Sequence, residues 1–229
     1  MSRVYKTTII EQKEVAEKTW EVSLKRPSDF SFQAGQYIQV NVPKLLYPDY
    51  KGPSRVFSIV SSPLDQEKIS VAFRDTNSGF KRTLEELPMN APVNIEGPHG
   101  FFTLPQSSAR PLVFLAGGIG IAPCLSMINF ATEKKLAQPI TLLYANRDKE
   151  SAAYFDTLSS LQKQNLHFTI KNKFGFVDAD FLKSTTKISP DAVWYIVGPP
   201  MMVANTKEML LHLAVDENRI FIEEFIGYE

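Results

Sequence analysis

The hydrophobic pattern of this 229-residue chain changes its period near residue 106, and that change constrains the fold more than any other feature. Before it, short segments alternate apolar and polar residues, and Pro, Gly, Asn and Asp turns separate them. Such alternation is typical of half-buried antiparallel strands, which close naturally into a small barrel or sandwich. The clearest of these segments are 19–26, 35–43, 55–62, 68–74 and 91–98.

After the clustered Ser and Pro residues at 105–111, the pattern becomes one of continuous apolar runs. These runs are 112–118, 140–146, 166–172 and 192–198. Amphipathic helical stretches occupy three of the gaps between or after them. Strand alternating with helix predicts a doubly wound parallel sheet. The sequence thus predicts an α+β two-domain fold, with an antiparallel β-barrel over 1–106 and an α/β domain over 107–229.

Charge and cysteine content exclude several classes of function. Lys plus Arg and Asp plus Glu each total 25, so no net field attracts nucleic acid or an anionic membrane. No apolar run approaches the ~18 residues that span a bilayer, and no signal-peptide core is present, so we expect a cytoplasmic protein without membrane insertion. One cysteine and three scattered histidines predict neither a metal site nor an iron–sulfur cluster.

A glycine-rich turn follows the first apolar run of the second half. Gly117, Gly118 and Gly120 end the run, and Pro123 opens the helical stretch behind them. Glycine lets a backbone turn sharply and approach a pyrophosphate, while a helix N-terminus offers unpaired N–H groups to it. We therefore interpret Gly118, Gly120 and Pro123 as a dinucleotide site. A tight strand-to-helix turn without a ligand is the alternative.

The second apolar run of this half ends in residues that a dinucleotide could contact. Asn146 and Arg147 stand where nucleotide-binding folds hold the ribose. Arg147 could meet a 2′-phosphate, yet Asp148 and Glu150 oppose its charge. The choice between NADH and NADPH therefore stays open.

The fourth run ends in a glycine–proline turn, Gly198 and Pro199. At the carboxyl edge of a parallel sheet, such a turn leaves room for a flat ring against the backbone. We interpret it as the nicotinamide position, and a simple turn is the alternative.

Several short motifs occur along the chain in a fixed order. They are RVFS at 55–58, GPHGFF at 97–102, GGIGIAP at 117–123, GPPMM at 198–202 and a C-terminal aromatic. Together they resemble the ferredoxin–NADP reductase family of flavoprotein reductases, over nearly the whole chain. The resemblance implies that the barrel binds FAD, that the α/β domain binds NAD(P)H, and that hydride passes from nicotinamide to flavin.

In that family the first motif reads R-x-[YF]-S and holds the flavin. The resemblance implies that Arg55 binds a flavin phosphate, that Phe57 packs on the isoalloxazine ring, and that Ser58 hydrogen-bonds near N5 of the ring. The spacing agrees, because Arg55 and Phe57 project to the same side of a strand, where a guanidinium can grip phosphate. A core strand with a surface arginine is the alternative.

Residues 78–88, SGFKRTLEELP, are similar to the family's second phosphate contact, a short helix with small or hydroxyl residues at its start. Ser78 can cap this helix, and its first turn carries Lys81, Arg82 and Thr83. A helix N-terminus beside cations suits a pyrophosphate. We assign Lys81 and Thr83 in preference to Arg82, and a solvated basic turn is the alternative.

Residues 220–229, IFIEEFIGYE, resemble the family's C-terminal strand, whose aromatic covers the flavin. The resemblance implies that Phe225 is a movable cap, with Tyr228 as the second candidate. A capping ring excludes water from the hydride path. Glu223 or Glu224 contacts the nicotinamide amide or relays a proton, or else is a solvated terminal acid.

The predicted function is a flavoprotein reductase with Ser58, Glu223 and Phe225 at the reacting rings. Because the sequence predicts neither a cluster nor a haem domain, the electrons are expected to pass to a separate ferredoxin, flavodoxin, oxygenase component, quinone or free flavin. Two alternatives stay open: a flavin-free nicotinamide dehydrogenase, and a nucleotide-binding module without turnover. The oligomeric state does not follow from the sequence.

Overall fold

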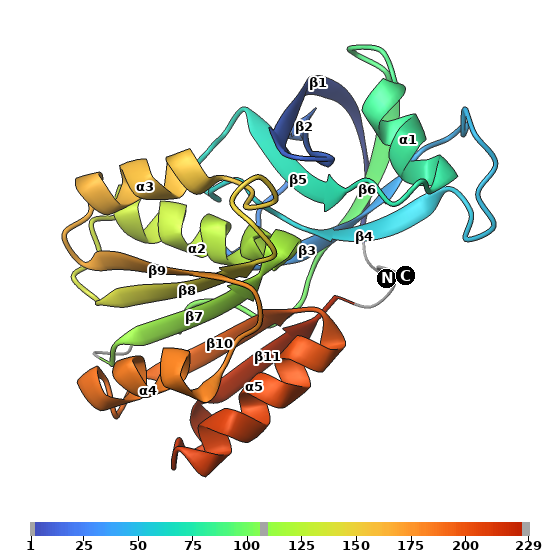
Figure 1. Cartoon of the computed structure of the whole chain (residues 1–229). Coiled ribbons are helices and arrows are strands. Elements are labelled where there is room, and N and C mark those ends of the chain that lie inside the picture. Colours follow the sequence, from blue (N-terminus) through green and yellow to red (C-terminus); the bar gives the residue numbers. More distant parts are fainter. Residues whose placement is uncertain (1–2, 106–109, 226–229) are drawn as a thin grey trace.

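The computed structural model describes residues 3–105 and 110–225 and contains two sheets, one in each half of the chain (Figure 1). The first half has β1 (Val4–Ala16), β2 (Thr19–Lys25), β3 (Tyr37–Asn41), β4 (Ser54–Ser58), β5 (Lys68–Arg74), α1 (Gly79–Glu86) and β6 (Pro92–His99). The second half has β7 (Leu112–Gly117), η1 (Gly118–Gly120), α2 (Ile121–Glu133), β8 (Ile140–Asn146), α3 (Phe155–Gln164), β9 (Phe168–Phe174), α4 (Ala179–Ile188), β10 (Val193–Gly198), α5 (Pro200–His212), η2 (Glu217–Arg219) and β11 (Ile220–Glu224). The predicted boundary between 106 and 107 falls outside the described residues and stays a prediction.

The first half is the predicted antiparallel barrel. Its six-stranded sheet has the order β4-β3-β6-β1-β2-β5. Just after β4, a bridge joins Ile59 to Val71, and Val60 N donates to Ser70 O at 2.8 Å. Because these contacts link the chain after β4 to β5, the two edges of the sheet close on each other.

Alternation along the strands fills the barrel. In β3, Ile38 and Val40 are fully buried, whereas the residues between and beside them are half-buried. Phe73 of β5 occupies the same core, and α1 packs on it through Phe80 and Leu84. The period-two pattern of the sequence therefore corresponds to inward-facing side chains.

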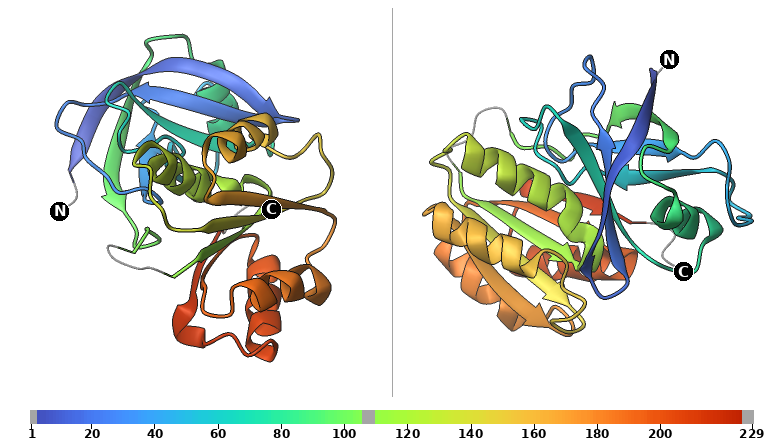
Figure 2. Two further views of the ribbon diagram at one scale, coloured as in Figure 1. Left: turned by 90° about the vertical axis from the view of Figure 1, so that its left-hand side faces the viewer. Right: turned by 90° about the horizontal axis from the view of Figure 1, so that it is seen from above.

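The second half is a parallel sheet with the order β11-β10-β7-β8-β9. Helices α2 and α3 cover one face, and α4 and α5 cover the other (Figures 1 and 2). The chain winds outward from β7 through β8 to β9, then returns to β10 on the other side of β7. In such open sheets, ligands bind beyond the carboxyl ends of the strands at the point where the winding reverses. That point lies between β7 and β10.

In the described part of the second half, an α-helix follows each of the four strands from β7 to β10, whereas the apolar periodicity predicts three helical stretches. Helices α3 and α4 span ten residues each. Leu158 is the buried residue of α3, so that helix has a narrow apolar face. In α4, Asp178 caps the start by accepting the Phe181 N–H at 2.8 Å.

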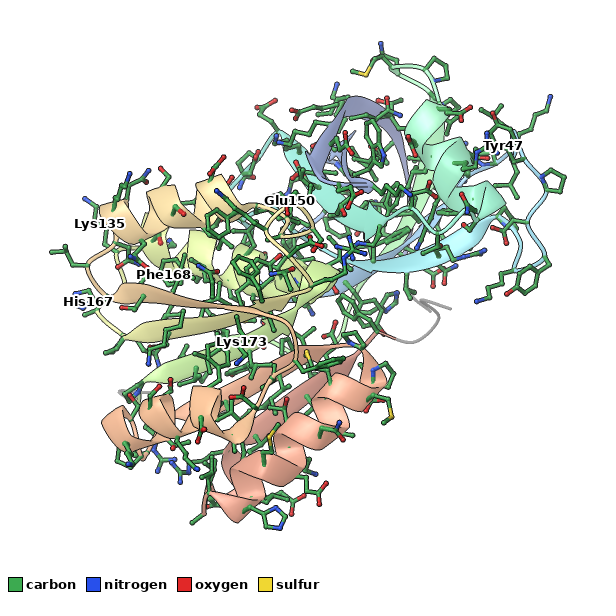
Figure 3. The ribbon with its side chains drawn as sticks, viewed as in Figure 1. Tyr47, Lys135, Glu150, His167, Phe168 and Lys173 are labelled. Carbon is green, nitrogen blue, oxygen red and sulfur yellow. The ribbon has the colours of Figure 1, made fainter. Side chains whose placement is uncertain are left out.

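The two halves pack closely against each other. The apolar cluster around α2 includes Val60, Ala72 and Phe102 from the first half. Ser126 of α2 donates to Ser61 O at 2.7 Å. The loop that carries Glu150 also reaches the barrel, where Glu150 O accepts the Glu17 N–H at 3.0 Å (Figure 3). Both apolar and polar contacts therefore position the sheet against the barrel.

Candidate functional site

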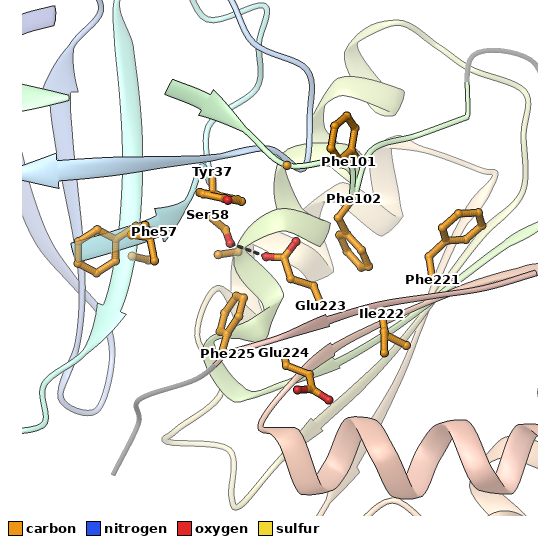
Figure 4. Close-up of a pocket in the computed structure, with 14 residues that line it drawn as sticks. Tyr37, Phe57, Ser58, Phe101, Phe102, Phe221, Ile222, Glu223, Glu224 and Phe225 are labelled. Carbon is orange, nitrogen blue, oxygen red and sulfur yellow. Dashed lines mark hydrogen bonds between the residues drawn. The ribbon is translucent and has the colours of Figure 1, made fainter. Parts of the chain in front are cut away.

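A cavity of about 550 Å³ opens where the two halves meet. Residues of β3, β4, β5, the segment after β6, α2 and β11 line it (Figure 4). Aromatic and aliphatic walls with a few polar groups are typical of a cofactor pocket of this volume. The lining includes Tyr37, Val56, Ser58, Phe102, Glu223 and Phe225.

One polar contact joins the two halves in this cavity. Ser58 Oγ, at the end of β4, donates to Glu223 Oε1 of β11 at 3.1 Å (Figure 4). Burial raises the pKa of Glu223 to about 7, and the Ser58 hydrogen bond offsets part of that rise. A carboxyl that titrates near neutrality can hold or release a proton under working conditions. The sequence predicts a role for each residue separately, and the structure brings the two into contact.

Phe225 follows β11 and lines the same cavity. It is half-buried, and its backbone N–H donates to Gly198 O at 3.0 Å. This bond ties the tail to the end of β10, where the sequence predicts the nicotinamide. The position suits the predicted cap, which stays a prediction, and Tyr228 lies outside the described residues.

The ring of Phe57 lies mainly inside the barrel. Phe57 is 7% exposed, and its ring centroid lies 5.6 Å from that of Phe73 and 6.1 Å from that of Phe80. Its neighbour Val56 is 61% exposed and lines the cavity, as does Tyr37. The stacking of Phe57 on a flavin stays a prediction. Val56 and Tyr37 are wall residues for which no sequence motif gives a signal.

Arg55 shares a face of β4 with Phe57, as the strand spacing predicts. Its guanidinium lies 5.2 Å from the ring centroid of Phe80, which Phe57 also contacts. Its Nη2 contacts Asp49 Oδ1 at 2.5 Å, and its Nη1 donates to three backbone carbonyls between residues 51 and 54. Arg55 therefore holds a carboxylate of the chain itself at the place where the sequence predicts a flavin phosphate.

Lys81 points toward the end of β5. Its Nζ donates to Arg74 O at 2.8 Å and to Thr76 Oγ1 at 3.1 Å. Burial lowers the pKa of Lys81 to about 8, although the nearby Asp75 acts to raise it. A phosphate contact by this side chain stays a prediction.

Thr83 is fully buried in α1. Its hydroxyl donates to Gly79 O at 2.7 Å and accepts the N–H groups of Leu46 at 3.0 Å and Tyr47 at 3.4 Å. A hydroxyl has one donor and two acceptor positions, so these bonds occupy all of them. The predicted phosphate contact of Thr83 therefore finds no support in its placement. Thr83 instead fastens the loop before β4 to α1.

Glycines bring the ends of β7 and β10 close together. A Cβ on Gly120 would lie 2.7 Å from Val197 O, and a Cβ on Gly198 would lie 2.6 Å from Met202 Cε. Close packing against backbone thus requires glycine at 120, whereas at 198 the positive φ of +154° favours glycine, in both cases with or without a ligand. The predicted dinucleotide contacts of Gly120, Gly198 and Pro199 stay predictions.

The turn between β7 and α2 leaves open space in front of one glycine. Gly118 has a φ of +54°, in the left-handed region that glycine adopts readily. A Cβ placed on it would meet nothing within 4 Å. Pro123 lies in the first turn of α2, as predicted. Gly118 directly follows β7, one of the two strands beside the switch point, where the sequence predicts the pyrophosphate.

The residues predicted to meet the ribose lie at the end of β8. Asn146 is buried, whereas Arg147 is exposed. Arg147 Nε contacts Asp148 Oδ2 at 2.6 Å, and its Nη2 contacts Glu17 Oε2 at 3.1 Å. Glu17 comes from the turn between β1 and β2. Its approach to Arg147 has no signal in the sequence.

Comparison with known proteins agrees with this geometry. Residues 6–104 match the oxidoreductase FAD-binding domain, and residues 114–208 match the oxidoreductase NAD-binding domain. The chain belongs to the ferredoxin–NADP reductase family of flavoprotein oxidoreductases. The barrel of this chain is thus an FAD-binding domain and its parallel sheet an NAD-binding domain. The aromatic cavity with a hydroxyl–carboxyl pair at its edge fits a flavin ring.

Individual relatives are distant. The chain is 27% identical to the phenol hydroxylase P5 protein of Acinetobacter pittii, over 97% of this chain and 66% of that protein. It is 25% identical to the phenol 2-monooxygenase reductase component of a Pseudomonas species, over 91% of this chain and 61% of that component. The chain therefore spans less than two thirds of these curated relatives.

A solved structure shows the same fold. The flavohem-like FAD/NAD-binding domain of nitric oxide dioxygenase from Vibrio cholerae O1 superposes with a TM-score of 0.82 at 20% identity. The match covers 96% of this chain and 98% of that domain. Both halves and their arrangement are therefore shared.

Two further observations concern residues 3–105 and 110–225. No helix there has the length and apolar character needed to cross a bilayer. No group of three or more His, Cys, Asp or Glu side chains there could hold a metal ion. Cys124 is fully buried, and burial raises the pKa of its thiol well above the ordinary value. It fills space in α2.

Proposed function

We propose that this reductase oxidises NAD(P)H and passes the electrons to a separate acceptor. The observation that carries the proposal is the cavity in which Ser58 of the FAD-binding half meets Glu223 of the NAD-binding half. Bound FAD would supply the ring that accepts hydride and releases electrons singly or in pairs. A cavity formed by both domains suits this chemistry, because the two cofactor rings have to meet there.

The side chains of the protein would position the cofactor rings, exclude water and hold or release a proton. Ser58 and Glu223 offer a donor and an acceptor at the cavity edge. With a pKa of about 7, Glu223 is about half protonated at neutral pH, so it can both hold and release a proton there. Phe225 lines the cavity, and as a cap it would limit the entry of water. Gly118 and Gly120 leave the N-terminus of α2 accessible to the dinucleotide phosphates.

The proposed acceptor is an oxygenase component. Two relatives carry names that support this choice, the phenol hydroxylase P5 protein and the reductase component of phenol 2-monooxygenase. Ferredoxin, flavodoxin, quinone and free flavin are the alternatives. The cytoplasm is the proposed compartment, because it holds the pool of reduced nicotinamide.

NADH is the proposed donor. Arg147 would be the partner of a 2′-phosphate, but Asp148 and Glu17 already engage its guanidinium. A third anion at this position would be repelled by both carboxylates. The dinucleotide without a 2′-phosphate avoids that repulsion.

Anaerobic reduction of the purified protein tests the proposed function. The protein is expected to be yellow, and NADH added under nitrogen is expected to bleach the flavin absorbance. A flavin that stays oxidised would indicate a binding module without turnover. A colourless protein that still oxidises NADH with another substrate would indicate a flavin-free dehydrogenase.

Replacing Ser58 tests the cavity assignment within the same assay. Ser58→Ala removes the hydroxyl at the polar edge, so bleaching should slow by about tenfold or more. Ser54→Ala is the matched control, because Ser54 lies on the same strand and bonds instead to Asn41. Equal rates in the two variants would place the reacting rings elsewhere.

A further inference from the structure

Asp49 places its carboxylate among groups that ordinarily bind a phosphate. Its Oδ1 contacts Arg55 Nη2 at 2.5 Å and accepts the Lys51 N–H at 2.9 Å, and its Oδ2 accepts the Phe80 N–H at 2.9 Å. The Asp49 side chain is 3% exposed. Burial acts to raise the pKa of Asp49, but these hydrogen bonds outweigh it and hold the pKa below its ordinary value. The group is therefore an anion at neutral pH.

The donors around Asp49 form a complete anion site. Phe80 lies in the first turn of α1, where backbone N–H groups point out along the positive end of the helix dipole. The Arg55 guanidinium approaches the same carboxylate from β4. A guanidinium beside a helix N-terminus suits phosphate well. Because these donors are occupied and like charges repel, a flavin phosphate and the Asp49 carboxylate cannot use them together.

The segment that carries Asp49, residues 46–49, lies across the first turn of α1. The hydroxyl of Thr83 holds two of its N–H groups, as described above. A Cβ on Gly79 would lie 2.2 Å from Pro48 O, so the segment touches the helix backbone directly. Tyr50, which follows the segment, is 91% exposed. Leu46, within the segment, is also 51% exposed, so these two side chains would lose little buried apolar surface if the segment moved.

We propose that Asp49 sets how tightly this protein holds phosphate-bearing flavins, by occupying the phosphate donors until the FAD pyrophosphate displaces it. The inference rests on the proposed function, because it needs the flavin ring to lie in the cavity beside Ser58. In the flavin-free protein, the carboxylate keeps Arg55 in place. When FAD binds, residues 46–49 leave α1, and the pyrophosphate takes the guanidinium and the Phe80 N–H. The measured association constant for FAD is then the intrinsic one multiplied by the fraction of molecules in which Asp49 has moved away.

Riboflavin separates binding of the ring from binding of the phosphates. It carries the same ring without a phosphate, so it can enter the cavity while Asp49 stays in place. Asp49→Asn keeps one oxygen, which can accept one of the two backbone N–H bonds, and removes the charge that holds Arg55. FAD should therefore bind this variant at least about tenfold more tightly, while the affinity for riboflavin changes by less than about twofold.

The test is a titration of the flavin-free 229-residue chain with FAD and with riboflavin, monitored by the quenching of flavin fluorescence. Asp65→Asn is the matched control, because Asp65 accepts the N–H groups of Glu67 and Lys68 in another turn of the same barrel. It should leave both affinities as in the wild type. Unchanged or weaker FAD binding by Asp49→Asn overturns the inference. If the wild type binds neither flavin, the proposed function itself fails.

Limited proteolysis of the wild type tests the same inference without a variant. Trypsin cleaves after Lys51, which lies just beyond residues 46–49. Saturating FAD should speed this cleavage, because the segment leaves α1, whereas saturating riboflavin should leave the rate unchanged. If FAD slows cleavage, or if the cleavage rate is the same with FAD as with riboflavin, the proposed displacement of Asp49 is wrong.

Discussion

Glu223 is an acid whose surroundings oppose its ionisation. Its carboxyl lines the cavity, and Ser58 gives it one hydrogen bond. Burial raises its pKa from 4.5 to about 7. A group with a higher pKa in the folded state stabilises the fold fully below its unfolded pKa, and that stability is lost as the pH rises through the folded pKa. For Glu223 this window runs from pH 4.5 to about 7.

Glu223→Gln removes this titration and keeps an oxygen that can accept the Ser58 hydrogen bond. Between pH 4.5 and 7, the free energy of unfolding of the flavin-free wild type should fall by about 2 kcal/mol relative to that of the variant. Urea unfolding at several pH values measures the difference. Glu224→Gln changes the exposed neighbour and should follow the wild type. If the difference in unfolding free energy between wild type and Glu223→Gln does not change with pH, Glu223 ionises in the folded protein as it does in water.

At the scale of elements, α1 is held by hydrogen bonds to the loop before β4 as well as by its own N-cap. Ser78 caps the helix by accepting the Lys81 N–H at 3.1 Å. Asp49 accepts the N–H of Phe80, and Thr83 accepts two N–H groups of the same loop. The helix and the loop before β4 therefore form one hydrogen-bonded unit.

Thr83→Val keeps the volume of the side chain and removes its hydroxyl. Two loop N–H groups would then lose their acceptor, which should cost about 1–3 kcal/mol of unfolding free energy. Chemical denaturation of the flavin-free protein measures the loss. Thr83→Ser retains the hydroxyl and should lose much less. Equal losses in the two variants would show that packing of the methyl group, rather than the hydrogen bonds, holds the loop.

Helices and strands could be predicted because the local order of apolar and polar residues follows which side chains are buried. The segment 68–74 coincides with β5, 140–146 coincides with β8, and α1 lies within the predicted 78–88. The loop before β4 has no such pattern. The position of Asp49 depends on Arg55 and on the N–H of Phe80, 31 residues further along the chain. No pattern within the loop indicates those partners.

At the scale of the whole molecule, the site depends on contacts between the two halves. Tyr154 donates to the buried carboxylate of Glu21 at 2.8 Å, and Arg74 donates to Ser151 O at 2.9 Å. These bonds join the barrel to the segment between β8 and α3. They hold the carboxyl ends of the parallel strands toward the barrel, which is where the cavity opens.

The contact between Glu17 and Arg147 joins the halves at the predicted ribose end of the sheet. Glu17→Gln should free Arg147 for a 2′-phosphate, so NADPH binding should tighten by about threefold relative to NADH, a small change because the pair is exposed. Dissociation constants of both nucleotides measure the ratio. Glu14→Gln removes a charge from the same hairpin and should leave the ratio unchanged. If Glu17→Gln also leaves the ratio of the two dissociation constants unchanged, Glu17 does not contribute to the choice between NADH and NADPH.

The site could be predicted only in pieces. Ser58 belongs to one motif and Glu223 to another, and each is predicted from its own neighbours. Their hydrogen bond spans 165 positions of the chain, so its geometry follows from how the barrel and the sheet pack. Tyr37 and Val56 line the cavity for the same reason. Motifs identify the chemistry of single residues, whereas the shape of the cavity comes from the packing of the two halves.

The order in which these parts are synthesised follows from their positions. A ribosome that has made the barrel has already made Asp49, Arg55 and α1, but neither Glu223 nor Phe225. If Arg55 and α1 bind the flavin phosphates as predicted, these donors are complete before the wall that contains Glu223 and Phe225 is made. A flavin bound to a translation product that stops after the barrel would then lack that wall and be open to water and to dioxygen.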